Sequence, residues 1–291
     1  MSYQYKPGQQ AMEARNVAGS GGGSRTTAKL MLRARNVLAA AIGAVLLVAG
    51  ATTAQAERDL KTTPKPTVVL LHGAWEDGSS WSGVTRRLQD DGYQVVAPAV
   101  PLRGIASDTS YLRGVLATIP GPKVLVGHSY GGALVSQLAD TPGVKSLVYV
   151  AAFIPEAGES LGALNAQFPG SEIGPDTTTV IVYDGGVDVA LKPESAGVFG
   201  ADIPARKGAV LIAAQRPVAA GVFTEPVEKT APAAIPKYAV IPTEDKAIAP
   251  AAERFMATRA GATQVEIRGA SHLVAVSEPG AVTKVIERAA G

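Results

Sequence analysis

Apolar and polar residues alternate in blocks along residues 57–291, and each block has the length of one strand or one helix. Short continuous apolar runs, such as TVVLL at 67–71, are typical of strands buried on both faces of a sheet. Between these runs apolar residues recur at helical spacing, as Trp81, Val84 and Leu88 do. The alternation predicts an α/β fold with a mostly parallel central sheet and helices on both faces. The predicted strands are 67–71, 93–96, 123–126, 144–152, 237–242 and 263–268, and the predicted helices are 81–88, 111–119, a helix from about 130, 251–260 and about 279–290.

Residues 154–235 interrupt this alternation. They are rich in Pro, Gly and Ala and contain only short apolar pieces such as TTTVIVY and AVLIAA. A stretch of this length is too long for a plain loop. We therefore expect one domain over 57–291, with a cap inserted at about 154–235.

The N-terminal leader, residues 1–56, has the pattern of a secretory signal peptide. Arg33 and Arg35 precede an apolar run at 37–51, and a tract of small residues ends at Ala56. An uncleaved membrane anchor is the alternative, but the run is short for a span of about 20 residues. We expect cleavage after Ala56, a secreted or periplasmic protein, and no stable membrane anchor afterwards.

Composition excludes several classes of function. The chain has no cysteine, so disulfides and thiolate chemistry are excluded, and with three histidines it offers little for a metal site, so none is predicted. The formal net charge is +2, but the leader carries six basic residues and one acid. The remainder has 21 basic and 24 acidic residues, a net charge of −3, which gives no basic surplus for nucleic acid.

Ser129 is the candidate nucleophile. It lies in GHSYG at 127–131, directly after the apolar strand KVLV and directly before a predicted helix. A G-x-S-x-G motif in that context predicts a tight strand-to-helix turn that exposes the serine hydroxyl, and glycine is needed because side chains would clash across the turn. A glycine-rich loop beside a helix cap is the alternative.

His272 is the candidate general base, since a serine hydroxyl is a poor nucleophile without one. It follows the strand TQVEIR, at the same sheet edge as Ser129. The acid of a Ser–acid–His series should lie between these two residues in sequence. Asp245, directly after the strand KYAVIP, fits best, with Glu244 and Glu156 as the alternatives.

The loop HGA at 72–74 follows the first strand, where a backbone N–H can face the substrate oxygen. We assign the oxyanion hole to the backbone N–H groups of Ala74 and Tyr130. His72 is expected to be structural, and His128 is expected to pack beneath the turn without titrating in catalysis.

These residues together resemble the α/β-hydrolase superfamily, and within it the branch of plant methylesterases, hydroxynitrile lyases and small bacterial esterases that includes pyrethroid-type carboxylesterases. The matching segments are VVLLHGAWEDGSSW (68–81), VLVGHSYGG (124–132), YVAAFIPEAGES (149–160), IPTEDKAI (241–248) and GASHLVAVSEPGAV (269–282). The resemblance implies the α/β-hydrolase fold and a triad of Ser129, Asp245 and His272. The lyases of this branch have a lysine directly after the catalytic histidine, whereas this chain has Leu273, which disfavours cyanohydrin cleavage.

The expected activity is that of a secreted carboxylesterase acting on small to medium esters, with a small-molecule ester as partner and no metal or cofactor. A lactonase, thioesterase, amidase or cofactor-free perhydrolase on the same triad remains open, as does a ligand-binding homologue with slow turnover. The oligomeric state is left open. The candidate substrate-binding side chains are aromatic, with ordinary core packing as the alternative: Trp75, Phe153, Phe168, Phe199 and Phe223.

Overall fold

The structure, a computed structural model, describes residues 64–291, which form one compact unit. The predicted leader and its cleavage site lie outside the described residues. Within residues 64–291, every helix is too short or too polar to cross a membrane.

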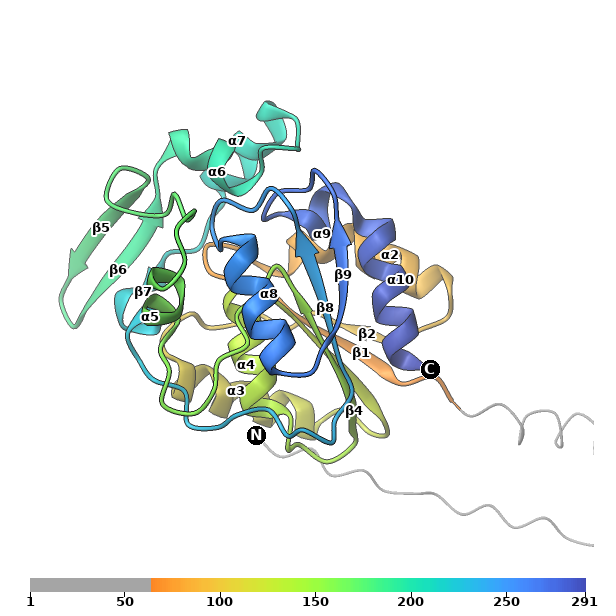
Figure 1. Cartoon of the computed structure of the whole chain (residues 1–291). Coiled ribbons are helices and arrows are strands. Elements are labelled where there is room, and N and C mark those ends of the chain that lie inside the picture. Colours follow the sequence, from red (N-terminus) through yellow and green to blue (C-terminus); the bar gives the residue numbers. More distant parts are fainter. Residues whose placement is uncertain (1–63) are drawn as a thin grey trace, which may run out of the picture. The chain divides into compact units, whose positions relative to one another are not determined.

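A six-stranded parallel sheet forms the centre of this unit (Figure 1). Its strand order is β2-β1-β3-β4-β8-β9, and every neighbouring pair runs parallel. The strands are β1 (Thr67–Leu71), β2 (Val95–Val96), β3 (Lys123–His128), β4 (Val144–Val150), β8 (Lys237–Pro242) and β9 (Thr263–Ile267). The predicted α/β fold with a mostly parallel sheet is thus confirmed.

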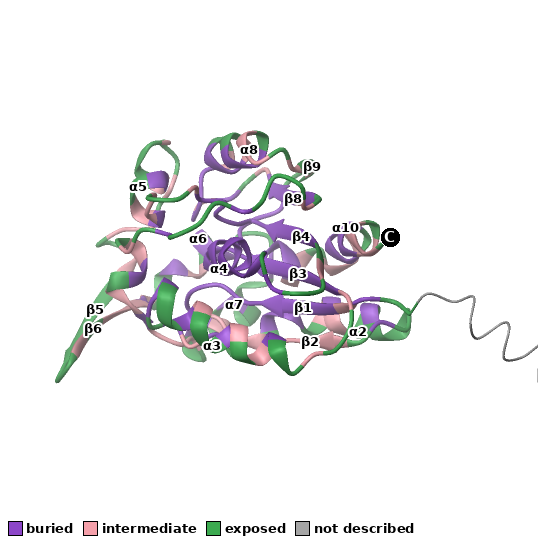
Figure 2. Ribbon diagram, turned by 90° about the horizontal axis from the view of Figure 1, so that it is seen from below, coloured by how far each residue is buried: buried purple, intermediate pink, exposed green. Residues whose placement is uncertain are grey.

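Both faces of the sheet are covered by helices because successive strand residues point to opposite sides. In β3, Val124 and Val126 pack into one apolar cluster and Leu125 into the other. One face is covered by α2 (Ser82–Asp90), α9 (Val274–Ser277) and α10 (Pro279–Ala290), and the other by α3 (Ile105–Ala117), α4 (Tyr130–Leu138) and α8 (Pro250–Arg259). Figure 2 shows the strands as the buried layer between these helices.

The order of the strands determines where a binding crevice can form. The chain runs from β1 outward to β2 and then crosses to β3 on the other side of β1. Such a reversal separates the loops at the carboxyl ends of the two strands and opens a crevice there. The loops that follow β1 and β3, which contain Ala74 and Ser129, therefore lie at this edge.

Among the element boundaries that differ from the sequence prediction, two are explained by specific hydrogen bonds. The strand expected at 93–96 is reduced to Val95–Val96, because the N–H of Tyr93 donates to the carbonyl of Leu88 and closes the turn after α2. The helix expected from residue 111 begins at Ile105. Its first turn is capped by Glu225, whose carboxylate accepts from the N–H groups of Ile105 and Ala106 at 2.7 and 2.9 Å, a contact that local periodicity cannot reveal.

Between β4 and β8 the chain leaves the central sheet and builds a separate three-stranded antiparallel sheet. This segment contains β5 (Thr178–Tyr183), β6 (Gly186–Leu191), β7 (Val218–Ala219), α5 (Leu161–Ala166), α6 (Ala196–Phe199), α7 (Ala205–Ala213) and the 3-10 helices η2 (Pro193–Ser195) and η3 (Ala220–Phe223). A further 3-10 helix, η1 (Gly78–Trp81), lies between β1 and α2. The apolar piece TTTVIVY is thus a strand and AVLIAA belongs to a helix. Figure 2 shows the β5–β6 hairpin extending outward with mostly exposed residues.

Candidate active site

Ser129 lies at a strained turn between β3 and α4. Its backbone has φ 52° and ψ −118°, a conformation that non-glycine residues rarely adopt. The turn is closely packed, since a Cβ on Gly127 would lie 2.3 Å from the carbonyl oxygen of Gly131. A Cβ on Gly131 would lie 2.6 Å from the carbonyl oxygen of Leu71. The two glycines of the motif are therefore required by backbone contact.

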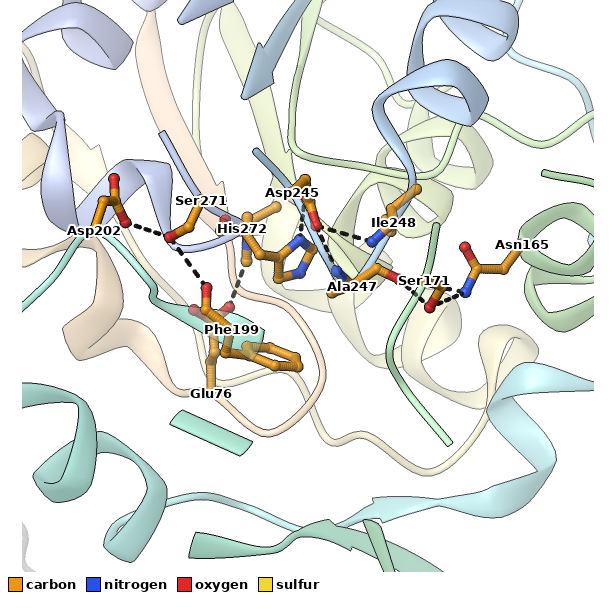
Figure 3. Close-up of polar contacts among 11 residues, drawn as sticks. Glu76, Asn165, Ser171, Phe199, Asp202, Asp245, Ala247, Ile248, Ser271 and His272 are labelled. Carbon is orange, nitrogen blue, oxygen red and sulfur yellow. Dashed lines mark hydrogen bonds and ion pairs between the residues drawn. The ribbon is translucent and has the colours of Figure 1, made fainter. Parts of the chain in front are cut away.

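His272 and Asp245 are hydrogen-bonded to each other. The imidazole Nδ1 lies 2.6 Å from Asp245 Oδ2, and both side chains are fully buried (Figure 3). The other carboxylate oxygen, Oδ1, accepts from the N–H groups of Ala247 and Ile248 at 2.7 and 2.9 Å. Burial raises the pKa of Asp245, but the His272 charge and these hydrogen bonds outweigh it and lower the pKa overall. Asp245 is therefore an acceptor for the Nδ1–H of His272.

The second ring nitrogen of His272 is free to act on another group. Nε2 is buried and has no hydrogen-bond partner within residues 64–291. Ser129 and His272 line the same cavity. In unliganded enzymes the hydrogen bond between nucleophile and base is often long and shortens when substrate binds. Of the alternative acids, Glu244 is exposed, and Glu156 pairs with Arg259 at 3.3 Å.

The two residues whose amides are assigned to the oxyanion hole also line this cavity. Ala74 and Tyr130 are both buried and both line it. Neither amide donates a hydrogen bond to another group in residues 64–291. The Tyr130 N–H is unpaired because it belongs to the first turn of α4, where helix amides have no intrahelical acceptor. Two free donors near Ser129 can stabilise an oxygen that gains negative charge.

The cavity has a volume of about 510 Å³, which is within the range of small-molecule sites. The five aromatic residues singled out in the sequence all line it: Trp75, Phe153, Phe168, Phe199 and Phe223. Trp75 is stacked on Phe223 with ring centroids 5.6 Å apart and meets the edge of Phe199 at 5.3 Å. The structure thus brings the predicted nucleophile, base, amides and aromatic side chains together around one cavity.

The capping segment also holds the loop of His272. The N–H of Leu273 donates to the carbonyl of Phe199 at 3.0 Å, and the hydroxyl of Ser271 donates to Asp202 (Figure 3). Leu273 packs 6% exposed in the core, beside the cavity rather than in it. The residue at the position of the lyase lysine is therefore an apolar packing residue.

His72 and His128 are both buried and hydrogen-bonded. His72 is fully buried, donates from Nδ1 to the carbonyl of Gly73 at 2.9 Å and accepts from the N–H of Val100 at 2.9 Å. Burial lowers its pKa, which favours the neutral ring that this pattern requires. His128 lies beneath the turn and contacts Glu76 at 2.6 Å.

Glu76 and Glu253 are the residues near the site that the sequence analysis missed. Glu253 on α8 is 2% exposed, and neither carboxyl oxygen has a hydrogen-bond partner within residues 64–291. Burial, and then the nearby charge of Asp245, raise its pKa well above the ordinary range, which favours the protonated carboxyl. The available signal was its position on the apolar face of α8, with Ala252, Met256 and Ala257.

Metal-ligating side chains do not gather in this part of the chain. Residues 64–291 contain no group of three or more His, Asp or Glu side chains that could hold a metal ion.

A parallel sheet with a strained serine turn, a buried Asp–His pair and an inserted cap defines the α/β-hydrolase class. A sequence profile described as the alpha/beta hydrolase family matches residues 68–285, and the chain belongs to this family. The resemblance inferred from the sequence motifs is therefore confirmed at the level of the family.

Two curated relatives are an esterase and a hydrolase by name, and each matches only part of the chain. A carbendazim-hydrolysing esterase of a Nocardioides species is 37% identical over 110 residues, which cover 33% of this chain and 46% of the relative. A pyrethroid hydrolase of Sphingobium wenxiniae is 34% identical over 104 residues, which cover 31% of this chain and 37% of the relative. The matched region thus spans less than half of each relative.

Solved structures share the fold over most of their length. Polyneuridine aldehyde esterase superimposes with a TM-score of 0.66 at 20% identity, covering 77% of this chain and 99% of that one. A pyrethroid hydrolase from Sphingobium faniae gives 0.64 at 22% identity, covering 77% and 97%. A methylesterase from Arabidopsis gives 0.65 at 17% identity, covering 77% and 98%.

Proposed function

We propose that this protein is a serine carboxylesterase that cleaves small to medium carboxylic esters through an acyl-enzyme on Ser129. One observation carries the proposal. Ser129, His272 bound to Asp245, and two amides with no hydrogen-bond partner in residues 64–291 all line a single cavity. The names of the partial relatives, one a carbendazim-hydrolysing esterase and the other a pyrethroid hydrolase, support the same class of reaction.

The first half of the reaction transfers the acyl group to the enzyme. Nε2 of His272 takes the proton of Ser129 while Oγ attacks the ester carbonyl, and Asp245 stabilises the imidazolium through Nδ1. The carbonyl oxygen becomes an oxyanion that accepts hydrogen bonds from the Ala74 and Tyr130 amides. The bond to the alcohol oxygen then breaks, and the imidazolium gives its proton to the leaving alcohol.

The second half restores the enzyme. Water enters the place of the alcohol and loses a proton to Nε2 of His272 as it attacks the acyl carbon. The same two amides hold the second oxyanion. When this intermediate collapses, the carboxylic acid leaves and Ser129 Oγ recovers its proton from His272.

The cavity wall supports esters with apolar groups. Its lining is mainly aromatic and aliphatic, with Asn165, Ser171 and Thr178 as polar members away from Ser129 on the capping segment. A pocket of about 510 Å³ accommodates an acyl or alcohol group of moderate size.

The test measures hydrolysis of p-nitrophenyl acetate and butyrate by the purified full-length chain, beside Ser129→Ala and His272→Ala. We expect many turnovers by the parent protein and background rates for both variants. Release of a single equivalent followed by arrest would instead indicate the ligand-binding alternative with blocked deacylation. Full activity of Ser129→Ala would refute the assignment of the nucleophile.

The leader pattern supports export as a second, independent proposal. We propose that the native host removes the leader after Ala56 and delivers the mature chain to the periplasm or the medium. Mass spectrometry of the intact protein from each fraction tests this. A mature N-terminus at Glu57 is expected, whereas a cytoplasmic protein that retains the run at 37–51 would refute it.

A further inference from the structure

Glu76 and His128 form a buried pair directly beneath the proposed active site. Oε2 of Glu76 lies 2.6 Å from Nδ1 of His128, and the two side chains are 9% and 2% exposed. Glu76 comes from the loop after β1 and His128 from the end of β3, 52 residues apart. The pair thus joins the two loops that carry Ala74 and Ser129.

The hydrogen bonds and the pKa shifts of the two groups together favour a charged pair. Nε2 of His128 lies 2.9 Å from the carbonyl oxygen of His272, which can only accept, so Nε2 must carry a proton. Nδ1 and Oε2 of Glu76 share a second proton, and the pKa shifts of the two groups place it on Nδ1. Burial lowers the pKa of His128, but the Glu76 charge and hydrogen bond outweigh it and raise the pKa overall. Burial likewise raises the pKa of Glu76, and the His128 charge outweighs it and lowers that pKa.

The same carboxylate oxygen binds the oxyanion loop. Oε2 of Glu76 accepts from the N–H of Gly73 at 2.9 Å, one residue before Ala74. The packing is tight, since a Cβ on Gly73 would lie 2.8 Å from Ser129 Cβ and 3.0 Å from His128 Nδ1. The backbone of the next residue, Trp75, has φ 63° and needs support from its surroundings to keep this conformation.

We propose that Glu76 and His128 are positioning residues of the esterase: through Gly73 N–H and His272 C=O they fix the oxyanion loop and the loop of the base relative to Ser129. This inference rests on the proposed function. The hydrogen bond to Gly73 extends the β1–β3 pairing beyond its last pair, Leu71 and Gly127, and the hydrogen bond to His272 links β3 to the loop after β9, a strand that does not pair with β3. A displacement of about 1 Å between reacting groups can reduce the rate about 100-fold. A carboxylate and an imidazolium that neutralise each other supply such a link without adding net charge beneath the oxyanion hole.

The surroundings of the pair hold few other titratable groups. On the Glu76 side, within residues 64–291, these are His72 and, around His72, Asp77 and Arg216. On the His128 side they are His272, whose ring centroid lies 4.6 Å away, and Asp245. Replacing the carboxylate of Glu76 therefore removes the one group in direct contact that stabilises the second proton of His128.

Three variants separate the charge from the hydrogen bonds. Glu76→Gln keeps an oxygen that can accept from both Gly73 and His128, but it removes the negative charge. Glu76→Leu removes the acceptor as well. Asp77→Asn is the matched control, because Asp77 caps the turn at Ser79 and touches neither Gly73 nor His128, and asparagine caps equally well.

The readouts are kcat and KM for p-nitrophenyl butyrate across the pH range in which the parent is folded, with active sites counted by a p-nitrophenyl phosphonate. For Glu76→Leu we expect kcat per active site to fall about 100-fold with little change in KM, because orientation and not binding is lost. For Glu76→Gln we expect a pH-dependent defect. The ratio of parent kcat to variant kcat should be near one at the acid end of the range. It should grow as the pH rises, because His128 of the variant loses its second proton at a lower pH than His128 of the parent.

Two outcomes would overturn the proposal. In the first, folded Glu76→Gln and Glu76→Leu keep the parent kcat per active site at every pH. In the second, activity falls only in proportion to the number of active sites, which indicates a role in folding alone. The Asp77→Asn control should match the parent throughout. Failure of the parent itself to turn over esters would refute the proposed function instead, so the two failures are distinguishable.

Discussion

Replacing Asp245 with asparagine should abolish catalysis while leaving the fold intact, because the contacts of this carboxylate dictate how the amide must turn. Oδ1 accepts from two backbone N–H groups, those of Ala247 and Ile248. An amide NH2 at that place would face two donors, so the asparagine oxygen must occupy it. The NH2 group is then directed at Nδ1 of His272, where the carboxylate oxygen now lies 2.6 Å away.

That orientation leaves the imidazole in the wrong tautomer. Nδ1 must accept from the asparagine NH2, so the proton resides on Nε2, and Nε2 can no longer take the proton of Ser129. Loss of the acid in a Ser–His–Asp triad through this tautomer change reduces kcat about 10⁴-fold. At about 1.36 kcal/mol for each factor of ten, the expected loss is about 5.4 kcal/mol of transition-state stabilisation.

The assay compares kcat and KM for p-nitrophenyl butyrate with the melting temperature of each protein. Glu244→Gln is the matched control, since it makes the same chemical change one residue earlier on an exposed side chain. We expect Asp245→Asn to lose kcat with a melting temperature near that of the parent, and Glu244→Gln to match the parent in both. A kcat for folded Asp245→Asn within tenfold of the parent would refute the reasoning.

Three further predictions concern the turn, the buried acid and the cavity. Gly127→Ala places a Cβ 2.3 Å from a backbone oxygen, which should cost about 3 kcal/mol of stability and lower the melting temperature by about 6–12 °C. Gly114→Ala in α3 is the control, because a Cβ there would have no atom within 4 Å and should not destabilise the protein. Equal melting temperatures for the two variants in calorimetry would contradict this prediction. Glu253 binds its proton more tightly when folded, so its contribution to stability is present at acid pH and is lost as pH rises above the ordinary glutamate range. The free energy of unfolding of Glu253→Gln, measured with urea, should therefore equal that of the parent near pH 4.5. Above that pH it should exceed the parent value by up to about 1.4 kcal/mol more for each pH unit. A difference in unfolding free energy that does not change with pH would contradict this prediction. Phe168→Ala should enlarge the cavity and raise the preference for octanoate over butyrate esters about tenfold in kcat/KM, with an unchanged ratio as the contrary result.

The pattern along the chain determined the architecture because each element buries its own apolar face. The run TVVLL could only be a strand buried on both sides, and the helical spacing from Trp81 to Leu88 anticipated α2. The motif GHSYG placed Ser129 at the turn because its glycines are required by contacts within a few residues. Information of this kind is local, and a sequence displays it directly.

Tertiary structure decided what depends on partners distant in the chain. Glu225 fixes the start of α3 from 119 residues beyond Ala106, and so the sequence pattern placed that start too late. The pairing of Glu76 with His128, and the burial of Glu253 beside Asp245, likewise follow from how β1, β3, β8 and α8 pack. Chain order and motif context indicated Ser129, Asp245 and His272 as candidates. The convergence of Ser129 and His272 on one cavity, with Asp245 hydrogen-bonded to His272, depends on the strand order of the folded sheet. Local periodicity predicts which face of a helix or strand is apolar, but it does not predict which charged group from elsewhere in the chain will contact that face.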